Sequence, residues 1–286
     1  MQLFRLVLLA GFAAALAAPA AHAADSDNEV ARSVSFGGSC PGCTLSRRKL
    51  MGANFAGANF AKAVLNGSDL RRASIAGSNF AGADFRNADL TSASLLGVNF
   101  IGASFEDSRM DQVRGVGLNF SGARLKRARM ESAQLIGANF VHADLTDSRL
   151  SGAALTAVNL TDVEARGADF SEANLTGARL GGGHFENANF REAVLEGADL
   201  AGAVFGHADF REARLTGAKL SGADLSGVRG LEQDQLEFAC GDSATRLPGR
   251  LAVKACHGRL ALEFHGWTPP HPAAAPIPPA APAPPH

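Results

Sequence analysis

A five-residue period constrains the fold of this chain more than any other feature of its sequence. From residue 45 to residue 225, every position divisible by five holds Leu, Phe, Ile or Met, except Gly115 and Ala165. A small residue, most often Ala, stands two places earlier. A helix turns about 100° per residue and a strand alternates with period two, so neither keeps residues five apart on one face. The chain must therefore turn once every five residues, and the intervening Gly, Asn, Asp and Ser favour such turns.

A second period, of twenty residues, indicates that four pentapeptides complete one coil. Phe recurs at 60, 80, 100, 120 and 140, and Leu recurs at 135, 155, 175, 195 and 215. Asn precedes each of those five Phe residues and recurs at Asn159, which predicts a ladder of stacked amides. Phe then moves to the opposite column at 170, 190 and 210. At Gly115 and Ala165, the nearby Val113 and Val163 predict local wall distortions that avoid a cavity.

The repeated unit A-N/D-L/F-x-x, as in Ala83-Asp84-Phe85 and Ala173-Asn174-Leu175, resembles the pentapeptide repeat family over about residues 43–228. The resemblance implies an all-β fold, a right-handed four-sided parallel β-helix. It places the large apolar residue and the preceding small residue inside, and the other three residues outside.

The segments around the repeats predict an exported protein, periplasmic or secreted. Residues 1–23 have a cationic start, an apolar run and a small-x-small site, as in a secretory signal peptide. A membrane anchor would instead need about 20 uninterrupted apolar residues. We expect an N-terminal cap at 24–44, the β-helix at 45–229 and a C-terminal cap at 230–264. The C-terminal cap would open with an amphipathic helix in "LEQDQLEFAC", and the Pro-rich residues 265–286 would form a disordered tail. No later stretch is apolar enough to span a membrane.

Four cysteines in an exported chain favour disulfides. The preferred pairing is Cys40 with Cys43 and Cys240 with Cys256, because the repeats would hold the two pairs roughly 40 Å apart. The same separation disfavours a four-cysteine zinc site. Thr44 follows Cys43 at the place where a haem attachment would need His. The motif CPGC at residues 40–43 also lacks the strand-helix context of a thioredoxin-like redox site.

No phosphate-binding loop, zinc-protease helix or nucleophile elbow occurs, so we expect no catalysis, cofactor or metal. The register would place His142 beside Asp162 and His184 beside Glu164, without a nucleophile in the next column. Glu172, Glu192 and Glu212 form the one acidic column, which Arg191 and Arg211 flank as ion-pair partners.

Charge is uneven along the predicted rod. Residues 44–130 hold 13 Lys and Arg against six Asp and Glu, a net of +7, whereas residues 131–230 hold eight against 14, a net of −6. The basic half contains the candidate interaction residues, which are Arg109, Arg129, Arg149, Arg124, Lys126 and Arg127. Stacked like charges repel, so this cluster suggests an anionic partner, although Asp107 and Asp147 would partly neutralise Arg127. Surface drift without a function is the competing interpretation.

Three functions remain from the sequence. The preferred one is a non-catalytic scaffold that binds a protein or an anionic envelope polymer through its faces, with end-to-end pairing of rods left open. The resemblance also raises a DNA-mimicking rod that binds topoisomerases, which would need a strongly acidic surface in the cytoplasm. An enzyme acting on extracellular polysaccharide would need a catalytic carboxylate pair. The near-zero net charge argues against nucleic acid as a partner.

Overall fold

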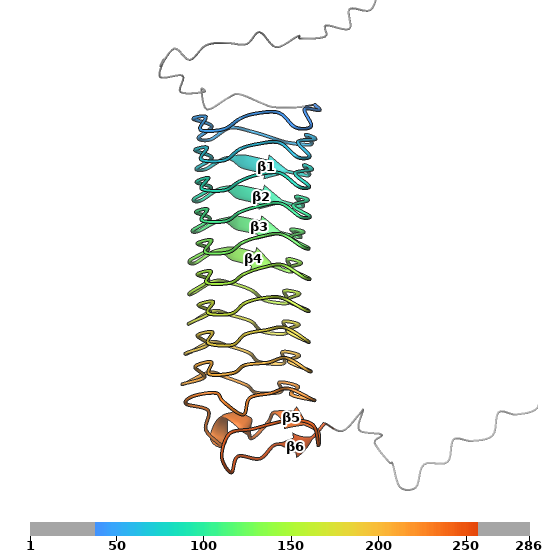
Figure 1. Cartoon of the computed structure of the whole chain (residues 1–286), viewed down its shortest axis with the longest axis vertical. Helices are drawn as coiled ribbons and strands as arrows, with labels where there is room; N and C mark the ends of the chain where they lie inside the picture. The colour runs from blue at the N-terminus through green and yellow to red at the C-terminus, as the bar shows by residue number, and fades with distance from the viewer. Residues whose placement is uncertain (1–37, 257–286) are drawn as a thin grey trace, which may run out of the picture.

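The chain forms a rod of stacked coils (Figure 1), described over residues 38–256 in a computed structural model. Parallel bridges join residues that are twenty apart, from Ser39 with Asn59 to Asp209 with Arg229. The predicted coil of four pentapeptides is therefore confirmed. The predicted signal peptide and Pro-rich tail lie outside the described residues.

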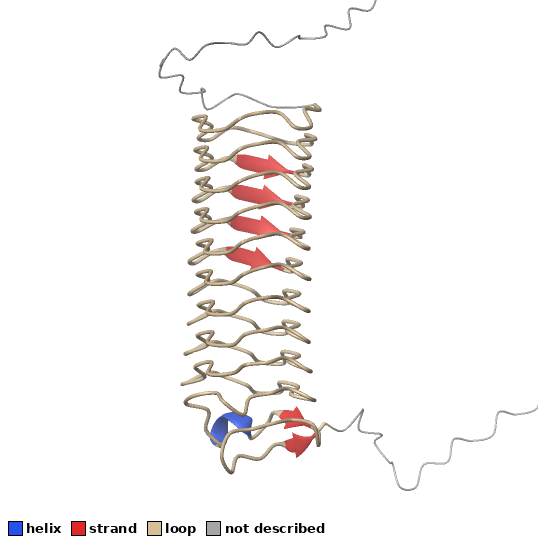
Figure 2. Cartoon of the chain, in the orientation of Figure 1, coloured by secondary structure: helices blue, strands red, loops and turns tan. Residues whose placement is uncertain are grey.

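Regular strands are short, because only about three residues lie between successive turns. Four stack as a parallel sheet (Figure 2): β1 (Ser74–Ala76), β2 (Ser94–Leu96), β3 (Arg114–Val116) and β4 (Gln134–Ile136). Each pairs with the next in a register of twenty, as Ile75 with Leu95. Elsewhere in the solenoid each side contributes a single bridging residue.

The interior is filled by the large residue and the small residue of each pentapeptide, as the period predicts. Almost every such residue from Leu50 to Leu225 is buried. Phenylalanine rings stack along the rod, with centroids 5.0 Å apart for Phe100 and Phe120 and 4.9 Å apart for Phe120 and Phe140. A second stack on another column joins Phe170 to Phe190 at 5.1 Å. The aromatic column thus changes sides near residue 160, which keeps the cross-section filled.

The asparagine ladder is partial. Amide bonds of 3.1 Å run from Asn99 to Asn79 and from Asn79 to Asn59. All six asparagines accept a bond from the backbone N–H two residues later, at 3.1 to 3.3 Å. In Asn119 and Asn159 the same oxygen also accepts a hydroxyl, from Ser121 and Thr161. Asparagine recurs at this place mainly because its side chain holds the following turn.

The two irregular repeats behave differently. At Gly115 the turn hydrogen bond that closes most pentapeptides is absent from the described structure, and the strand continues to Val116. Leu118, in a position usually held by Ala, fills the space beside the glycine: a Cβ on Gly115 would lie 2.4 Å from its Cδ1 atom. The turns after Ile75 and Leu95 are open in the same way, so the distortion spans three coils.

Ala165 departs from the expectation. Its turn is closed by a 3.2 Å bond from the Ala168 N–H, and its own N–H bonds to His184 in the next coil at 2.8 Å. The predicted wall distortion is therefore wrong here. Val163 is fully buried beside it, and the small change in volume leaves the backbone regular.

Both ends correct the expected boundaries. Ser39 and Thr44, placed in the predicted N-terminal cap, already pair with the next coil, so the described solenoid begins before residue 45. At the other end, the expected amphipathic helix is only one 3-10 turn, η1 (Asp234–Leu236). The chain must become extended again by Cys240, which bonds to Ala218 and Leu220 of the last coil.

The C-terminal cap closes the open edge of the solenoid with side chains and two short strands. β5 (Cys240–Gly241) pairs in parallel with β6 (Lys254–Ala255). The Gln235 amide donates to the carbonyls of Phe210 and Ala213 at 2.9 and 2.7 Å. The Thr245 hydroxyl donates to the Leu220 carbonyl at 2.8 Å. Phe210 and Leu220 also accept the turn N–H groups of Ala213 and Ala223, so the cap gives these two carbonyls a second donor and gives the Ala213 carbonyl the donor that no further coil supplies.

Candidate interaction surface

The candidate residues lie on the outside because each pentapeptide buries only two of its five side chains. The register stacks Arg109 on Arg129 and Arg129 on Arg149 along one side of the rod. Arg124 bridges to Ser104 and Asp144 on the adjoining side, and Lys126 and Arg127 occupy the corner between the two sides. We call these six residues the basic surface: Arg109, Arg124, Lys126, Arg127, Arg129 and Arg149.

Acidic neighbours partly neutralise the basic surface. Arg129 lies 3.3 Å from Asp111 and 3.5 Å from Glu131, and Glu131 also lies 3.9 Å from Arg149. Arg124 lies 3.3 Å from Glu106. Over residues 38–256, no ion pair involves Arg109 or Lys126. These two cations are therefore the members most available to a partner.

The predicted neighbour of Arg127 is confirmed as an ion pair with Asp107 at 2.7 Å. Two parallel hydrogen bonds from the guanidinium lower the pKa of the Asp107 carboxyl, since they favour its charged form. Asp147 acts on Arg127 through its charge, without a direct bond. This pair holds Arg127 against the surface of the rod.

The other sequence candidates do not form a catalytic site. His142 lies 3.9 Å from Asp162. His184 stacks on Glu164 as the register predicts, but its ring lies 3.4 Å from Glu186, and Glu164 pairs with Arg166. Arg191 lies 3.1 Å from Glu192 and 3.8 Å from Glu212, as expected for a surface ion-pair network. No group of three His, Cys, Asp or Glu in the described part could hold a metal ion.

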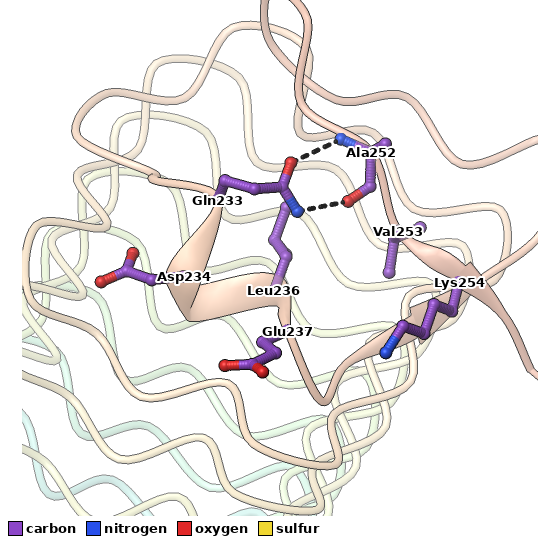
Figure 3. A pocket seen from close by; sticks show the side chains of 7 residues that line it. All are labelled: Gln233, Asp234, Leu236, Glu237, Ala252, Val253 and Lys254. Atoms are coloured by element: carbon purple, nitrogen blue, oxygen red, sulfur yellow. Dashed lines mark hydrogen bonds between the residues drawn. The ribbon is translucent and has the colours of Figure 1, made fainter.

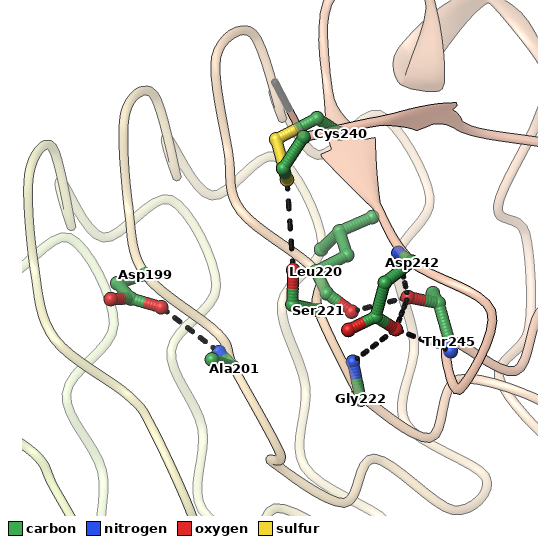
Figure 4. Close-up of a disulfide and its surroundings, with 9 residues drawn as sticks. Asp199, Ala201, Leu220, Ser221, Gly222, Cys240, Asp242 and Thr245 are labelled. Carbon is green, nitrogen blue, oxygen red and sulfur yellow. Dashed lines mark hydrogen bonds between the residues drawn. A yellow bond between two sulfur atoms is a disulfide. The ribbon is translucent and has the colours of Figure 1, made fainter. Parts of the chain in front are cut away.

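Both cysteine pairs are joined as the sequence favoured. Cys40 and Cys43 are bonded with Cα atoms 5.5 Å apart, and Cys240 and Cys256 with Cα atoms 4.7 Å apart. The second bond ties β5 to the end of β6, beside the Ser221 hydroxyl, which donates to the Cys256 Sγ at 3.7 Å (Figure 4). Asp242 below it accepts the Gly222 N–H at 2.9 Å, which lowers the pKa of its carboxyl.

A pocket of about 550 Å³ lies in the C-terminal cap (Figure 3), between η1 and β6. The Gln233 amide is already used, in hydrogen bonds of 2.9 and 3.0 Å with the Ala252 backbone, and the charged side chains of Asp234, Glu237 and Lys254 also line the pocket. Leu236 and Val253 supply its apolar wall. The arrangement suits a packing gap in the cap and contains no converging catalytic groups.

One exposed feature was missed by the sequence reasoning. Leu96, Val116 and Ile136 stack at one corner, with 57%, 56% and 46% of their surface exposed. The signal was present, because large aliphatic residues recur there at the place just after the buried residue, where most repeats have small or polar residues. Within residues 38–256, no helix has the length and apolar character needed to cross a bilayer.

Comparisons with known proteins agree with this geometry. A family profile described as pentapeptide repeats matches residues 42–75, 49–87, 153–191 and 188–227, and a second, described as a pentapeptide repeat region, matches residues 83–160. No match was found among curated protein sequences.

Among solved structures, one similar protein is HetL from the cyanobacterium Nostoc, a pentapeptide repeat protein involved in heterocyst differentiation regulation. It has 28% identity and a TM-score of 0.57, over 66% of this chain and 83% of that one. QnrB1, a plasmid-mediated fluoroquinolone resistance protein, has 17% identity and a TM-score of 0.38, over 73% and 94%. A pentapeptide repeat protein of the Arabidopsis thaliana thylakoid lumen has 32% identity and a TM-score of 0.15, over 44% and 77%.

The repeat register, the filled four-sided interior and the family match lead to one conclusion. The fold is the right-handed four-sided parallel β-helix that the sequence predicts. Proteins of this kind are generally non-enzymatic repeat scaffolds. The chain belongs to the pentapeptide repeat family.

Proposed function

We propose that this protein is an exported, non-catalytic scaffold that binds an anionic protein or envelope polymer through the basic surface. The observation that carries the proposal is the placement of Arg109 and Lys126. Each stands on the outside of a rigid wall and forms no ion pair among the described residues, although the charge of Lys126 acts on Asp107. A rigid array of stacked repeats presents such side chains without a backbone ordering cost on binding, so that only their own rotamers must be ordered.

The neighbouring pairs support the same role. Arg124, Arg127 and Arg129 are held in place by Glu106, Asp107 and Asp111, so their positions are set before a partner arrives. Their net charge is partly cancelled, and long-range attraction comes from the excess of +7 over residues 44–130. That excess favours an anionic partner over a DNA-mimicking role, which needs an acidic surface.

Export is the part of the proposal that rests on sequence, through the signal-like residues 1–23. Fractionation of cells that express the full chain or a chain without these residues tests it. We expect the full chain outside the cytoplasm and the shortened chain inside. Equal cytoplasmic retention of both would contradict export.

Binding is tested with the double variant Arg109→Glu and Lys126→Glu. The matched control is Arg179→Glu and Lys219→Glu, which makes the same charge change in the acidic half, again at cations without an ion pair in the described structure. The probes are a polyglutamate and a carboxylated polysaccharide, immobilised at physiological salt, and chemical cross-linking to the protein's own envelope.

We expect the retention of the Arg109→Glu and Lys126→Glu variant on the immobilised polymers to fall at least tenfold, and the retention of the control variant to fall less than twofold. Equal losses would mean that net charge alone governs binding, and no loss would exclude the basic surface. The circular dichroism of all three proteins should match, because every changed side chain lies outside the core.

A further inference from the structure

One side of the rod has no charged residue over four successive coils. The segments 76–82, 96–102, 116–122 and 136–141 contain no Asp, Glu, Lys, Arg or His. We call this side, with its two bordering corners, the asparagine face, after Asn79, Asn99, Asn119 and Asn139 at its centre. The rest of a single coil differs sharply, since residues 103–115 alone hold Glu106, Asp107, Arg109, Asp111 and Arg114.

Both borders of the asparagine face carry exposed apolar side chains. Leu96, Val116 and Ile136 line one corner, and Ile101 is 46% exposed at the other, where Val141 is half-buried. Single exposed aliphatic residues are normal on a protein surface. Here, however, four of the five large hydrophobic residues exposed in the described part fall on one side of the rod, with the half-buried Val141 beside them.

The side-chain oxygens at the centre of the face already have hydrogen-bond donors, and the amide N–H groups of Asn119 and Asn139, which donate no bond within the described structure, are available to acceptors across a contact. The asparagine oxygens already accept backbone N–H groups, as Ile101 N–H to Asn99 at 3.1 Å and Val141 N–H to Asn139 at 3.2 Å. Gly97, Gly117 and Gly137 occupy the corner beside the aliphatic column, and no atom lies within 4 Å of where their Cβ would stand. A second flat surface could therefore approach closely.

We propose that the asparagine face packs against the asparagine face of a second copy of this chain, with the two rods antiparallel. A two-fold axis across the rods at the coil of Val116 places Val116 against its own copy. Leu96 then lies opposite Ile136, and Ile101 opposite Val141. Both aliphatic borders are covered at once, and no charged group of the four segments enters the contact.

Charge decides between the two orientations that would bury these residues. A parallel arrangement also sets one aliphatic border against the other, but it places the two basic halves, each with a net of +7, side by side. With the axis at the coil of Val116, the antiparallel arrangement instead sets residues 44–101, with a net of +4, beside residues 131–188 of the second copy, with a net of −5. Only residues 102–130, with a net of +3, lie beside their own copy. The charged sides of the two rods meet at the edges of the contact, where their separation is close to the screening length of about 8 Å at physiological salt. Their electrostatic interaction therefore favours the antiparallel orientation.

The size of the face sets the expected strength. Four coils at about 4.8 Å per layer give a strip roughly 19 Å long. Such a strip falls short of the roughly 800 Å² per partner of a standard stable interface. We therefore expect a reversible dimer with a dissociation constant on the order of micromolar, which concentration-dependent methods can detect.

The first test is sedimentation velocity with small-angle X-ray scattering on the purified protein, from about 2 to 200 µM. We expect a monomer-dimer equilibrium in which the dimer is about twice as thick as the monomer. Because the axis lies off the middle of the described rod, the two staggered solenoids together span only about three coils, roughly 15 Å, more than one solenoid. A dimer of doubled length would show end-to-end pairing instead and would overturn the proposal. A protein that stays monomeric at 200 µM would overturn it as well.

Substitutions locate the contact. Val116→Glu buries two carboxylates against each other at the axis, so the dissociation constant should rise at least tenfold. The matched control is Ser151→Glu, at the equivalent place in a pentapeptide on a different corner, and it should leave the constant within twofold. Equal effects of the two variants would refute the assigned face.

A cross-link provides an independent readout, because Val116 alone among the aliphatic residues meets its own copy. Under mild oxidation, Val116→Cys should form a disulfide-linked dimer in high yield, and Ser151→Cys should not. A parallel dimer would instead cross-link the double variant Leu96→Cys and Ile101→Cys in preference to Val116→Cys. That preference would refute the antiparallel arrangement.

Discussion

Exchanging the two irregular core residues of one coil is the sharpest test of how this solenoid is packed. Gly115 stands where other repeats have a large residue, and Leu118 stands where most have Ala. A Cβ added at Gly115 would lie 2.4 Å from the Leu118 Cδ1, 2.9 Å from its Cγ and 3.1 Å from the Leu95 carbonyl oxygen. Leu118 thus occupies the volume that the usual side chain at residue 115 would fill.

These distances set the magnitudes. Gly115→Ala overpacks the coil and should lower the free energy of unfolding by about 1–3 kcal/mol. Leu118→Ala empties the same space; its side chain is 1% exposed, so we expect a loss of about 3–5 kcal/mol. The double variant Gly115→Leu and Leu118→Ala restores the ordinary repeat and should lie within about 1.5 kcal/mol of the parent, as volume-conserving exchanges do.

Guanidinium denaturation followed by circular dichroism gives the stabilities, and hydrogen exchange of β2, β3 and β4 reports on the affected coils alone. The local readout matters because stacked repeats need not unfold in a single step. We expect a large favourable coupling free energy between residues 115 and 118. If the double variant were as unstable as the sum of Gly115→Leu and Leu118→Ala, the proposed compensation would be refuted.

Three further predictions follow from the described contacts. Hydrogen bonds and nearby cations lower the pKa of six aspartates, which are Asp69, Asp84, Asp107, Asp209, Asp224 and Asp242. Their contribution to the free energy of unfolding is therefore present above about pH 4 and is lost as the pH falls through the lowered pKa values. Thermal midpoints measured from pH 7 to pH 2 should fall only below about pH 4. Removing the bond between Cys240 and Cys256, which closes a sequence separation of 16, should cost about 3 kcal/mol of cap stability and speed amide exchange in β5; unchanged exchange would contradict this. Gln235→Ala leaves the Ala213 carbonyl without its donor, while the Phe210 carbonyl keeps the Ala213 N–H, and should cost about 1–3 kcal/mol, whereas Gln235→Glu retains the shape but not the donor and should be no better.

The architecture could be predicted from the sequence because every pentapeptide favours the same backbone conformation. One irregular repeat cannot shift a register that more than thirty others share, so Ala165 is absorbed without distortion. Local exceptions needed the structure. The amphipathic pattern around η1 predicted a longer helix, but the open edge of the last coil recruits Cys240 into an extended segment, and tertiary pairing overrides local propensity.

The surface was harder to predict than the core. The twenty-residue register correctly stacked Arg109, Arg129 and Arg149, yet it did not show that Glu131 lies within 4 Å of two of them. Such pairs depend on side-chain reach across a corner, for which a periodic pattern has no information. The aliphatic column at Leu96 and Val116 was visible in the sequence, and its exposure does not depend on the turn, because Ile136 occupies the same place beside a closed turn and is exposed as well.

The two proposed surfaces have a joint consequence, because they lie on opposite sides of the rod. Asn99 and Arg109 are ten residues apart, half of a coil, so pairing through the asparagine face leaves the arginine column outermost on both copies. The two columns then point in opposite directions, and they cannot both engage one flat surface. They can, however, bridge two separate polymer chains.

Mixing the protein with a soluble carboxylated polysaccharide should therefore raise light scattering near equivalence, and the rise should collapse in excess polymer. Val116→Glu should bind the immobilised polymer with the affinity of the parent but fail to raise the scattering, since a monomer has one basic column. Arg109→Glu with Lys126→Glu should lose binding and scattering together while still forming dimers. Undiminished scattering with Val116→Glu would show that bridging does not depend on the asparagine face, because each single rod would then hold two polymer chains by itself.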